Sequence, residues 1–146
     1  MTSLELAGRT LEVDVETTRA FYANRPLWSQ TCGCSYCRNF VSACSIGRLP
    51  EQLRSTLESF GIEPSRDEGE IWQYNDNEDG THLYGGFYHV VGTIVSENLN
   101  RENSQDEIHF SFSAKLDLLS ADFPQPAIQV EFAANIPWVL PESPGS

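Results

Sequence analysis

Basic residues are scarce in this sequence of 146 residues. Nine Lys and Arg stand against 21 Asp and Glu, which gives a formal net charge of −12 at pH 7. Non-specific binding of nucleic acid needs a row of Lys and Arg, and the sequence has no such row. The same negative charge would repel anionic lipid. We therefore expect neither nucleic acid nor a membrane among its partners.

Long apolar runs are also missing. No stretch approaches the roughly 18 apolar residues that a membrane-spanning helix requires. Residues 1–6 lack a basic region followed by an apolar core, which argues against a signal peptide. The sequence therefore predicts a cytoplasmic protein with reduced cysteines, so an even number of cysteines is no evidence for disulfides.

Internal repeats and linkers are absent, and the length predicts a single domain over residues 1–146. A chain of this size buries roughly 70% of its unfolded surface, so it needs neither a metal nor a disulfide to fold. Apolar residues make up 40% of the chain and charged residues 21%, which is typical of a globular protein.

Periodicity in the first half predicts one strand and two helices. Residues 11–15 alternate between apolar and acidic and predict a strand, whereas the aromatic-rich segment 21–28 has no clear period and is expected to form a loop. A first helix should begin near Ser35, with an apolar stripe at the spacing i, i+3, i+4, i+7. A second helix should run from Pro50 to Gly61, and the pair predicts an αα-hairpin.

The second half has the patterns of β-structure. Strands are expected over 71–74, 82–95, 108–116 and 128–132, with turn-forming residues at 75–80. Residues 97–107 are expected to form a polar loop, and the proline-rich tail 136–146 is expected to be irregular. One-faced alternation predicts an antiparallel sheet of about five strands with the αα-hairpin on one face, which is the α+β class.

Chemistry is indicated by one stretch, residues 32–40, which holds three of the four cysteines. Cys32, Cys34 and Cys37 can supply three thiolates to zinc, with His89, His82 or Cys44 as a fourth ligand. A convincing zinc signature has two half-sites, and the second is missing here. Cys37 and Cys44 also fit the apolar stripe of the first helix, where a free cysteine is an ordinary small hydrophobic residue.

The same stretch allows two other kinds of thiol chemistry. Residues 34–37 form a CxxC motif at a predicted helix start, where the helix dipole lowers the pKa of a thiol. A thioredoxin-like fold needs a βαβ context, which the surrounding pattern does not provide. A cysteine nucleophile needs a histidine base, for which His89 is a candidate, although His89 equally fits a hydrogen-bonded core position.

A resemblance rests on two segments, Cys-Gly-Cys-Ser-Tyr-Cys-Arg-Asn-Phe at 32–40 and Leu-Tyr-Gly-Gly-Phe-Tyr-His-Val-Val-Gly at 83–92. They resemble a small family of uncharacterised bacterial proteins with a CxYCRNF-like segment and a later aromatic-His-aromatic-Gly strand. The resemblance covers roughly residues 30 to 95. It implies a bacterial cytoplasmic origin and supplies no catalytic residues.

We expect the protein to be an acidic binding or interaction module rather than an enzyme, without a cofactor and with a protein or small molecule as its partner. Aromatic side chains over 21–28 and 72–88 would line part of a binding groove. The alternative is a thiol-dependent protein, zinc-binding or redox-active, centred on Cys32, Cys34 and Cys37.

Overall fold

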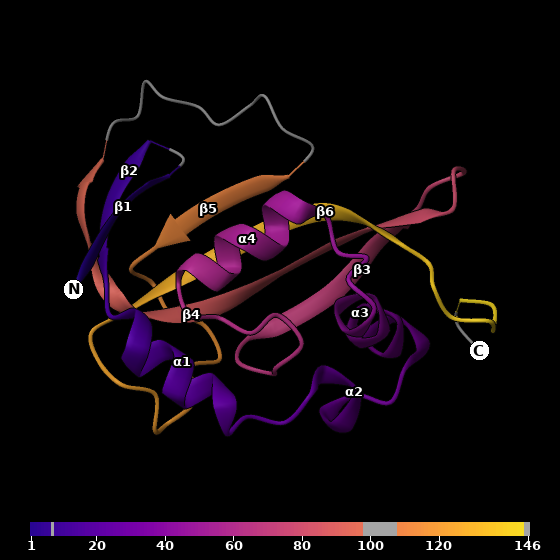
Figure 1. Ribbon diagram of the computed structural model, residues 1–146, viewed down its shortest axis with the longest axis horizontal. Coiled ribbons are helices and arrows are strands. Elements are labelled where there is room, and N and C mark those ends of the chain that lie inside the picture. Colours follow the sequence, from indigo (N-terminus) through magenta and orange to yellow (C-terminus); the bar gives the residue numbers. More distant parts are fainter. Residues whose placement is uncertain (7, 98–107, 145–146) are drawn as a thin grey trace.

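An antiparallel sheet organises the protein, and among the described residues four helices accompany it (Figure 1). The computed structural model describes residues 1–6, 8–97 and 108–144. In chain order the elements are β1 (Thr2–Leu6), β2 (Arg9–Val13), α1 (Val15–Ala23), α2 (Trp28–Thr31), α3 (Ser35–Ser45), α4 (Glu51–Ser59), β3 (Glu70–Asp76), β4 (Thr81–Glu97), β5 (His109–Ser113) and β6 (Ala127–Pro137).

In the part of the chain that the structure describes, the sheet has six strands in the order β1-β2-β4-β6-β5, with β3 also paired to β4. All the pairs are antiparallel. The 17-residue β4 is the central strand, because its first half pairs with β3, its second half pairs with β2, and β6 runs along its other side. The α+β class and the antiparallel sheet are therefore confirmed, with β1 as a strand that the sequence pattern did not predict.

The loop predicted for residues 21–28 is confirmed only over residues 24–27, which connect α1 to α2, and is wrong for residues 21–23 of α1 and for Trp28 of α2. The strand predicted for 11–15 ends at Val13, and α1 begins at Val15. The helix starts there because Asp14 is its N-cap: a carboxylate oxygen of Asp14 accepts a hydrogen bond from the backbone N–H of Thr17 at 3.1 Å. Alternating residues at 11–15 concealed this helix start, since a capping Asp and a polar strand residue look alike in sequence.

The two predicted helices are present as α3 and α4, joined by residues 46–50. Helix α3 begins at Ser35, as predicted, and ends before Gly47, whose φ of 72° is the left-handed conformation that favours glycine. In Figure 1, α4 lies lengthwise and α3 is seen nearly end-on, so the two helices cross instead of running antiparallel.

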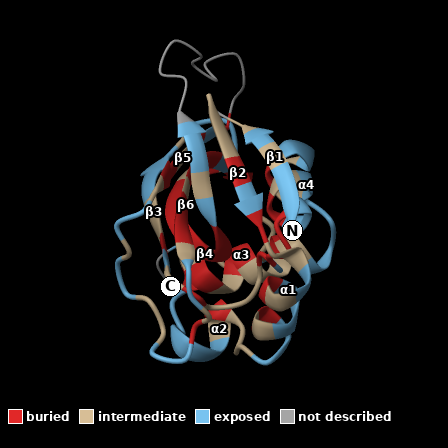
Figure 2. Ribbon diagram, turned by 90° about the vertical axis from the view of Figure 1, so that its left-hand side faces the viewer, coloured by how far each residue is buried: buried red, intermediate tan, exposed pale blue. Residues whose placement is uncertain are grey.

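One apolar core lies between the helices and one face of the sheet. Figure 2 shows the helices on one side of the sheet and the buried residues concentrated between the two layers. From the helices, Phe40 packs against Tyr84, and Phe60 packs against Phe112 with ring centroids 5.9 Å apart. The alternation predicted for 108–116 is confirmed over its first part, because Ile108, Phe110 and Phe112 are buried, whereas Ala114 is exposed.

The remaining strand predictions differ from the structure mainly at their ends. Strand β6 continues to Pro137, into the segment expected to be irregular, and β5 ends at Ser113, earlier than expected. Most of the predicted polar loop 97–107 lies outside the described residues. Within the described part of the chain, no helix has both the length and the apolar character needed to span a membrane.

Candidate functional site

The three neighbouring cysteines lie where the chain turns from α2 into α3. Helix α2 is short, and it is anchored by the buried Trp28, whose indole N–H donates to the backbone oxygen of Pro64 at 2.8 Å. The chain leaves α2 in an extended conformation at Cys32 and enters α3 with Cys34 as the N-cap residue. Two helix ends therefore hold the intervening residues in a tight turn.

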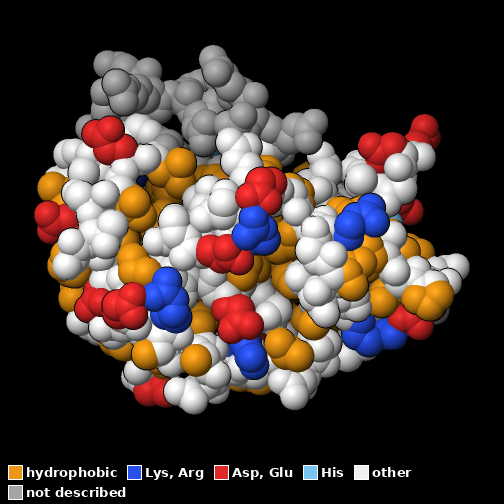
Figure 3. All heavy atoms as spheres, viewed as in Figure 1, with side chains coloured by type: hydrophobic (Ala, Val, Ile, Leu, Met, Phe, Trp, Pro, Cys, Tyr) orange, Lys and Arg blue, Asp and Glu red, His pale blue; other side chains and the backbone are white. Residues whose placement is uncertain are grey.

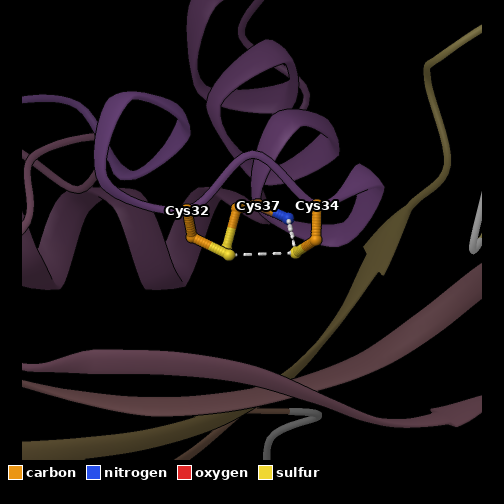
Figure 4. Close-up of side chains that lie close together, drawn as sticks. All are labelled: Cys32, Cys34 and Cys37. Atoms are coloured by element: carbon orange, nitrogen blue, oxygen red, sulfur yellow. Dashed lines mark hydrogen bonds between the residues drawn. The ribbon is translucent and has the colours of Figure 1, made fainter.

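This turn brings the three sulfur atoms together, as Figure 4 shows. The Sγ atoms of Cys32 and Cys34 are 3.2 Å apart, and the backbone N–H of Cys37 donates to Sγ of Cys34 at 3.5 Å. All three sulfur atoms lie within 4.8 Å of one another. Cys32 and Cys34 are exposed, whereas Cys37 is buried, so the cluster (Cys32, Cys34 and Cys37, the thiol cluster below) is open on one side.

The thiols of the cluster differ in acidity. Burial alone would raise the pKa of Cys34, but hydrogen bonds from the backbone N–H of Cys37 and from the Cys32 thiol outweigh it and lower that pKa. Burial, followed by the hydrogen bonds to the other two cysteines, raises the pKa of Cys37. The exposed Cys34 is therefore the thiol that becomes a thiolate more readily, and the inner Cys37 is the thiol that resists ionisation.

The C-terminal segment after β6 holds the first turn of α3 in place. Arg38 donates to the backbone oxygen of Gly33 at 3.2 Å and forms an ion pair with Glu142. The amide of Asn39 is buried and makes two hydrogen bonds there, donating to the backbone oxygen of Pro137 at the end of β6 at 3.1 Å and accepting from the N–H of Val139 at 2.7 Å. These hydrogen bonds and the ion pair fix the start of α3, and with it the thiol cluster, against the C-terminal end of β6 and the residues that follow it.

His89, the predicted fourth ligand or base, is not brought to the thiol cluster. It is fully buried, with Nδ1 3.2 Å from Glu68 and Nε2 3.3 Å from Gln129. Its neighbours along β4, Tyr84 and Tyr88, point toward the helices, so the imidazole of His89 lies on the other face of the sheet. The alternative interpretation, a hydrogen-bonded core histidine, fits this placement.

The other two predicted partners are also elsewhere. His82 is buried, with its ring 4.9 Å from that of Trp138 and Nε2 3.6 Å from Asp76. Cys44 lies beside a cavity of about 410 Å³ between α3, α4 and residues 63–65. Burial, with a contribution from the nearby Glu63 carboxylate, raises the pKa of Cys44 to about 12. Among the described residues, no histidine or carboxylate joins the three cysteines.

Glu68 is the ionisable residue that the sequence analysis missed. It is fully buried and accepts hydrogen bonds from the backbone N–H of Ser120 at 3.1 Å and from the Ser120 hydroxyl. Burial alone would raise the pKa of Glu68, but the hydrogen bonds from His89 and Ser120 outweigh it and lower that pKa. Gln129 also belongs to this group of hydrogen-bonded residues. Its Oε1 lies 3.3 Å from Nε2 of His89 and accepts a hydrogen bond from the backbone N–H of Asp117 at 2.7 Å.

Local sequence contains no signal for Glu68. It stands in the run Asp67-Glu68-Gly69-Glu70, which has the composition of a solvated loop, and its partners are 21 and 52 residues away. Only the tertiary fold brings these groups together. We call Glu68, His89, Ser120 and Gln129 the buried polar network.

Comparison of the chain with protein-family models, curated proteins and solved structures finds no match. The resemblance of residues 30–95 to a bacterial family therefore stays a prediction.

Proposed function

We propose that the protein binds a thiophilic metal ion, with zinc as the first candidate, through the thiolates of Cys32, Cys34 and Cys37. The observation that carries the proposal is the convergence of the three sulfur atoms within 4.8 Å of one another on a turn held by two helices. Thiolates are preferred ligands of zinc, and three protein ligands leave a fourth position for water, a small molecule or a partner's side chain.

The surroundings of the cluster suit an anionic ligand set. The helix dipole of the 11-residue α3 and the backbone N–H of Cys37 both favour a thiolate at Cys34. Arg38 adds a positive charge in the same turn of the helix. Because metal binding requires deprotonated thiols, these groups reduce the free energy needed to form the thiolates before the ion binds.

An open coordination position agrees with a binding module better than with a purely structural zinc site. Structural sites are closed by four protein ligands, and in the described part of the chain only three residues form the group. The fold also has an extensive apolar core of its own, so it does not depend on the metal for stability. The bound ion would serve to recruit a ligand.

Metal analysis tests this proposal directly. Protein treated with a chelator under reducing conditions, then incubated with Zn²⁺ and desalted, should retain about one zinc ion per chain, because thiolate sites bind zinc tightly. Cys34→Ser should abolish this retention.

Cys44→Ala is the matched control, since Cys44 is a cysteine of the same helix that lies outside the cluster. It should leave the zinc content unchanged. Zinc content that is negligible in the wild type, or that Cys34→Ser does not reduce, would overturn the proposal.

A second candidate function is thiol–disulfide exchange, and the opposite pKa directions of Cys34 and Cys37 favour it. The Cys34 thiolate would attack one sulfur of a substrate disulfide and displace the other as a thiolate. Cys37 would then lose its proton and attack Cys34, releasing the second substrate thiol. The substrate disulfide is reduced to two thiols, and Cys34 and Cys37 are oxidised to a disulfide.

Mass spectrometry after equilibration in glutathione buffers of graded redox potential separates the two functions. Exchange activity predicts a Cys34–Cys37 disulfide that forms and reopens within the range of potentials set by the buffers. A protein that keeps all four thiols across this range and still binds zinc has the first function alone.

A further inference from the structure

The face of the sheet that turns away from the helices carries a group of aromatic side chains. On this face, Phe123 covers the middle of β4 at His89, with ring centroids 5.9 Å apart. Further toward the start of β4, Tyr74 on β3 is 59% exposed and Trp72 is half-buried, whereas Phe87 is buried. Figure 2 shows this side of the sheet without a covering helix.

The register between β3 and β4 places the aromatic side chains of this face next to one another. Trp72 of β3 lies opposite Gly85 of β4, and the Trp72 ring contacts those of Tyr74 and Phe87, with centroids 5.6 and 6.2 Å away. Tyr74 lies against the sheet because Gly85 has no side chain: a Cβ atom there would be 2.3 Å from the Tyr74 ring. Gly85 therefore allows an exposed tyrosine to rest on the backbone.

Two carboxylates belong to the same face. Glu70 of β3 and Glu131 of β6 are both in register with Phe87 of β4, so the three side chains form one row across the sheet. We call Glu70, Trp72, Tyr74, Phe87 and Glu131 the aromatic face.

The two charged residues of the aromatic face, Glu70 and Glu131, are both acidic. Strands β3, β4, β5 and β6 contain no Lys or Arg. Within the described part of the chain, neither Glu70 nor Glu131 forms an ion pair.

The helix side of the molecule differs in this respect. Figure 3 shows basic and acidic side chains interleaved on that side. Arg54, for example, pairs with both Glu51 and Glu58. Carboxylates such as Glu51 and Glu58 thus have a basic partner on the helix side, whereas in the described part of the chain the two carboxylates of the aromatic face have none.

We infer that the aromatic face binds arginine side chains of a partner polypeptide. A guanidinium group stacks on tyrosine and tryptophan rings and forms paired hydrogen bonds to carboxylates, so it matches both kinds of group on this face. The face is formed by neighbouring strands of a sheet and not by a concave pocket of the kind in which small molecules bind. A peptide with exposed arginines is therefore the occupant that fits its shape and charge. This binding does not depend on the thiol cluster.

Fluorescence anisotropy with labelled peptides tests the inference. Capped pentapeptides Gly-Arg-Gly-Arg-Gly, Gly-Lys-Gly-Lys-Gly and Gly-Gln-Gly-Gln-Gly would be titrated with the protein at low salt. The arginine peptide should bind about threefold more tightly than the lysine peptide, because only guanidinium combines stacking with paired hydrogen bonds. The glutamine peptide should not bind.

Substitutions separate the aromatic face from general attraction to an acidic protein. Tyr74→Ala should weaken the arginine peptide about fivefold, the loss expected for one exposed cation–π contact. Glu131→Gln should weaken it about threefold. Glu12→Gln, which removes an exposed charge on β2, is the matched control and should have no such effect.

NMR locates the binding. The indole N–H signal of Trp72 should shift with the arginine peptide, while those of Trp28 and Trp138 stay in place. The inference is overturned if the arginine peptide does not bind, if the arginine and lysine peptides bind equally, or if Tyr74→Ala and Glu12→Gln have the same effect.

Discussion

The buried polar network and the thiol cluster are both groups of reactive side chains, and they differ in what surrounds them. In the network, Glu68 and His89 are fully buried and hydrogen-bonded to one another and to the protein. In the thiol cluster, Cys32 and Cys34 are exposed, and their sulfur atoms are hydrogen-bonded to one another and to the backbone N–H of Cys37.

This difference separates a structural role from a binding role. Hydrogen bonds that satisfy every polar atom of a buried group stabilise one conformation and leave no unpaired donor or acceptor for a ligand. No buried side-chain nitrogen or oxygen atom in the described part of the chain lacks a hydrogen-bond partner. A carboxylate–histidine pair, which suggests acid–base catalysis, is here part of the core. Cysteines with exposed sulfur atoms keep their coordinating ability.

Removing Glu68 should have the largest effect on stability. Glu68→Ala should lower the free energy of unfolding by about 3–5 kcal/mol, because it leaves the buried His89 and the partly buried Ser120 without their acceptor. Chemical denaturation measures this loss. Glu70→Ala, two residues along the chain and exposed, is the control and should cost less than about 0.5 kcal/mol. Equal costs at both positions would contradict a structural role for the network.

Acid should weaken the network as well. The pKa of Glu68 is lowered from 4.5 in the folded protein, so its carboxylate stabilises the fold fully above pH 4.5. That contribution is lost as the pH falls below 4.5 through the lower folded-state value. Denaturation of wild type and Glu68→Ala across this range should show the difference between them narrowing with acid. A difference independent of pH would mean that the Glu68 charge contributes nothing.

Substitutions of Cys37 and Cys34 compare a buried and an exposed member of the thiol cluster. Cys37→Ser should cost about 1–3 kcal/mol in denaturation, because it places a hydroxyl in a buried position without an assured partner. Cys34→Ser should cost less than about 0.5 kcal/mol, since the residue is exposed and serine is itself a favourable N-cap. A large loss from Cys34→Ser would show that the cluster is structural.

How far sequence alone leads can be seen at two helix starts. The α3 start was predictable, because an apolar stripe at helical spacing follows Ser35. The α1 start was missed, because Asp14 and Val15 continue a strand-like alternation and the N-cap hydrogen bond to Thr17 is visible only in the structure. Local patterns predict an element when spacing is distinctive and fail when two periods agree over a few residues.

The candidate site shows the same limit. Cys32, Cys34 and Cys37 are close in sequence, so their convergence was predictable from spacing. The network around His89 was not, because its partner Glu68 comes from a loop 21 residues earlier and is oriented by the fold. Distant pairs of this kind depend on strand order and loop paths, which carry no signal in a short window of sequence.

Site-resolved thiol labelling, with and without zinc, tests the central claim most directly. In the metal-free protein N-ethylmaleimide should modify Cys32 and Cys34 first, since they are exposed, and Cys44 slowly, since burial raises its pKa to about 12. Zinc should protect Cys32, Cys34 and Cys37 together and leave the labelling rate of Cys44 unchanged. Labelling rates of Cys32 and Cys34 that zinc does not alter would contradict the assignment of this cluster as the binding site.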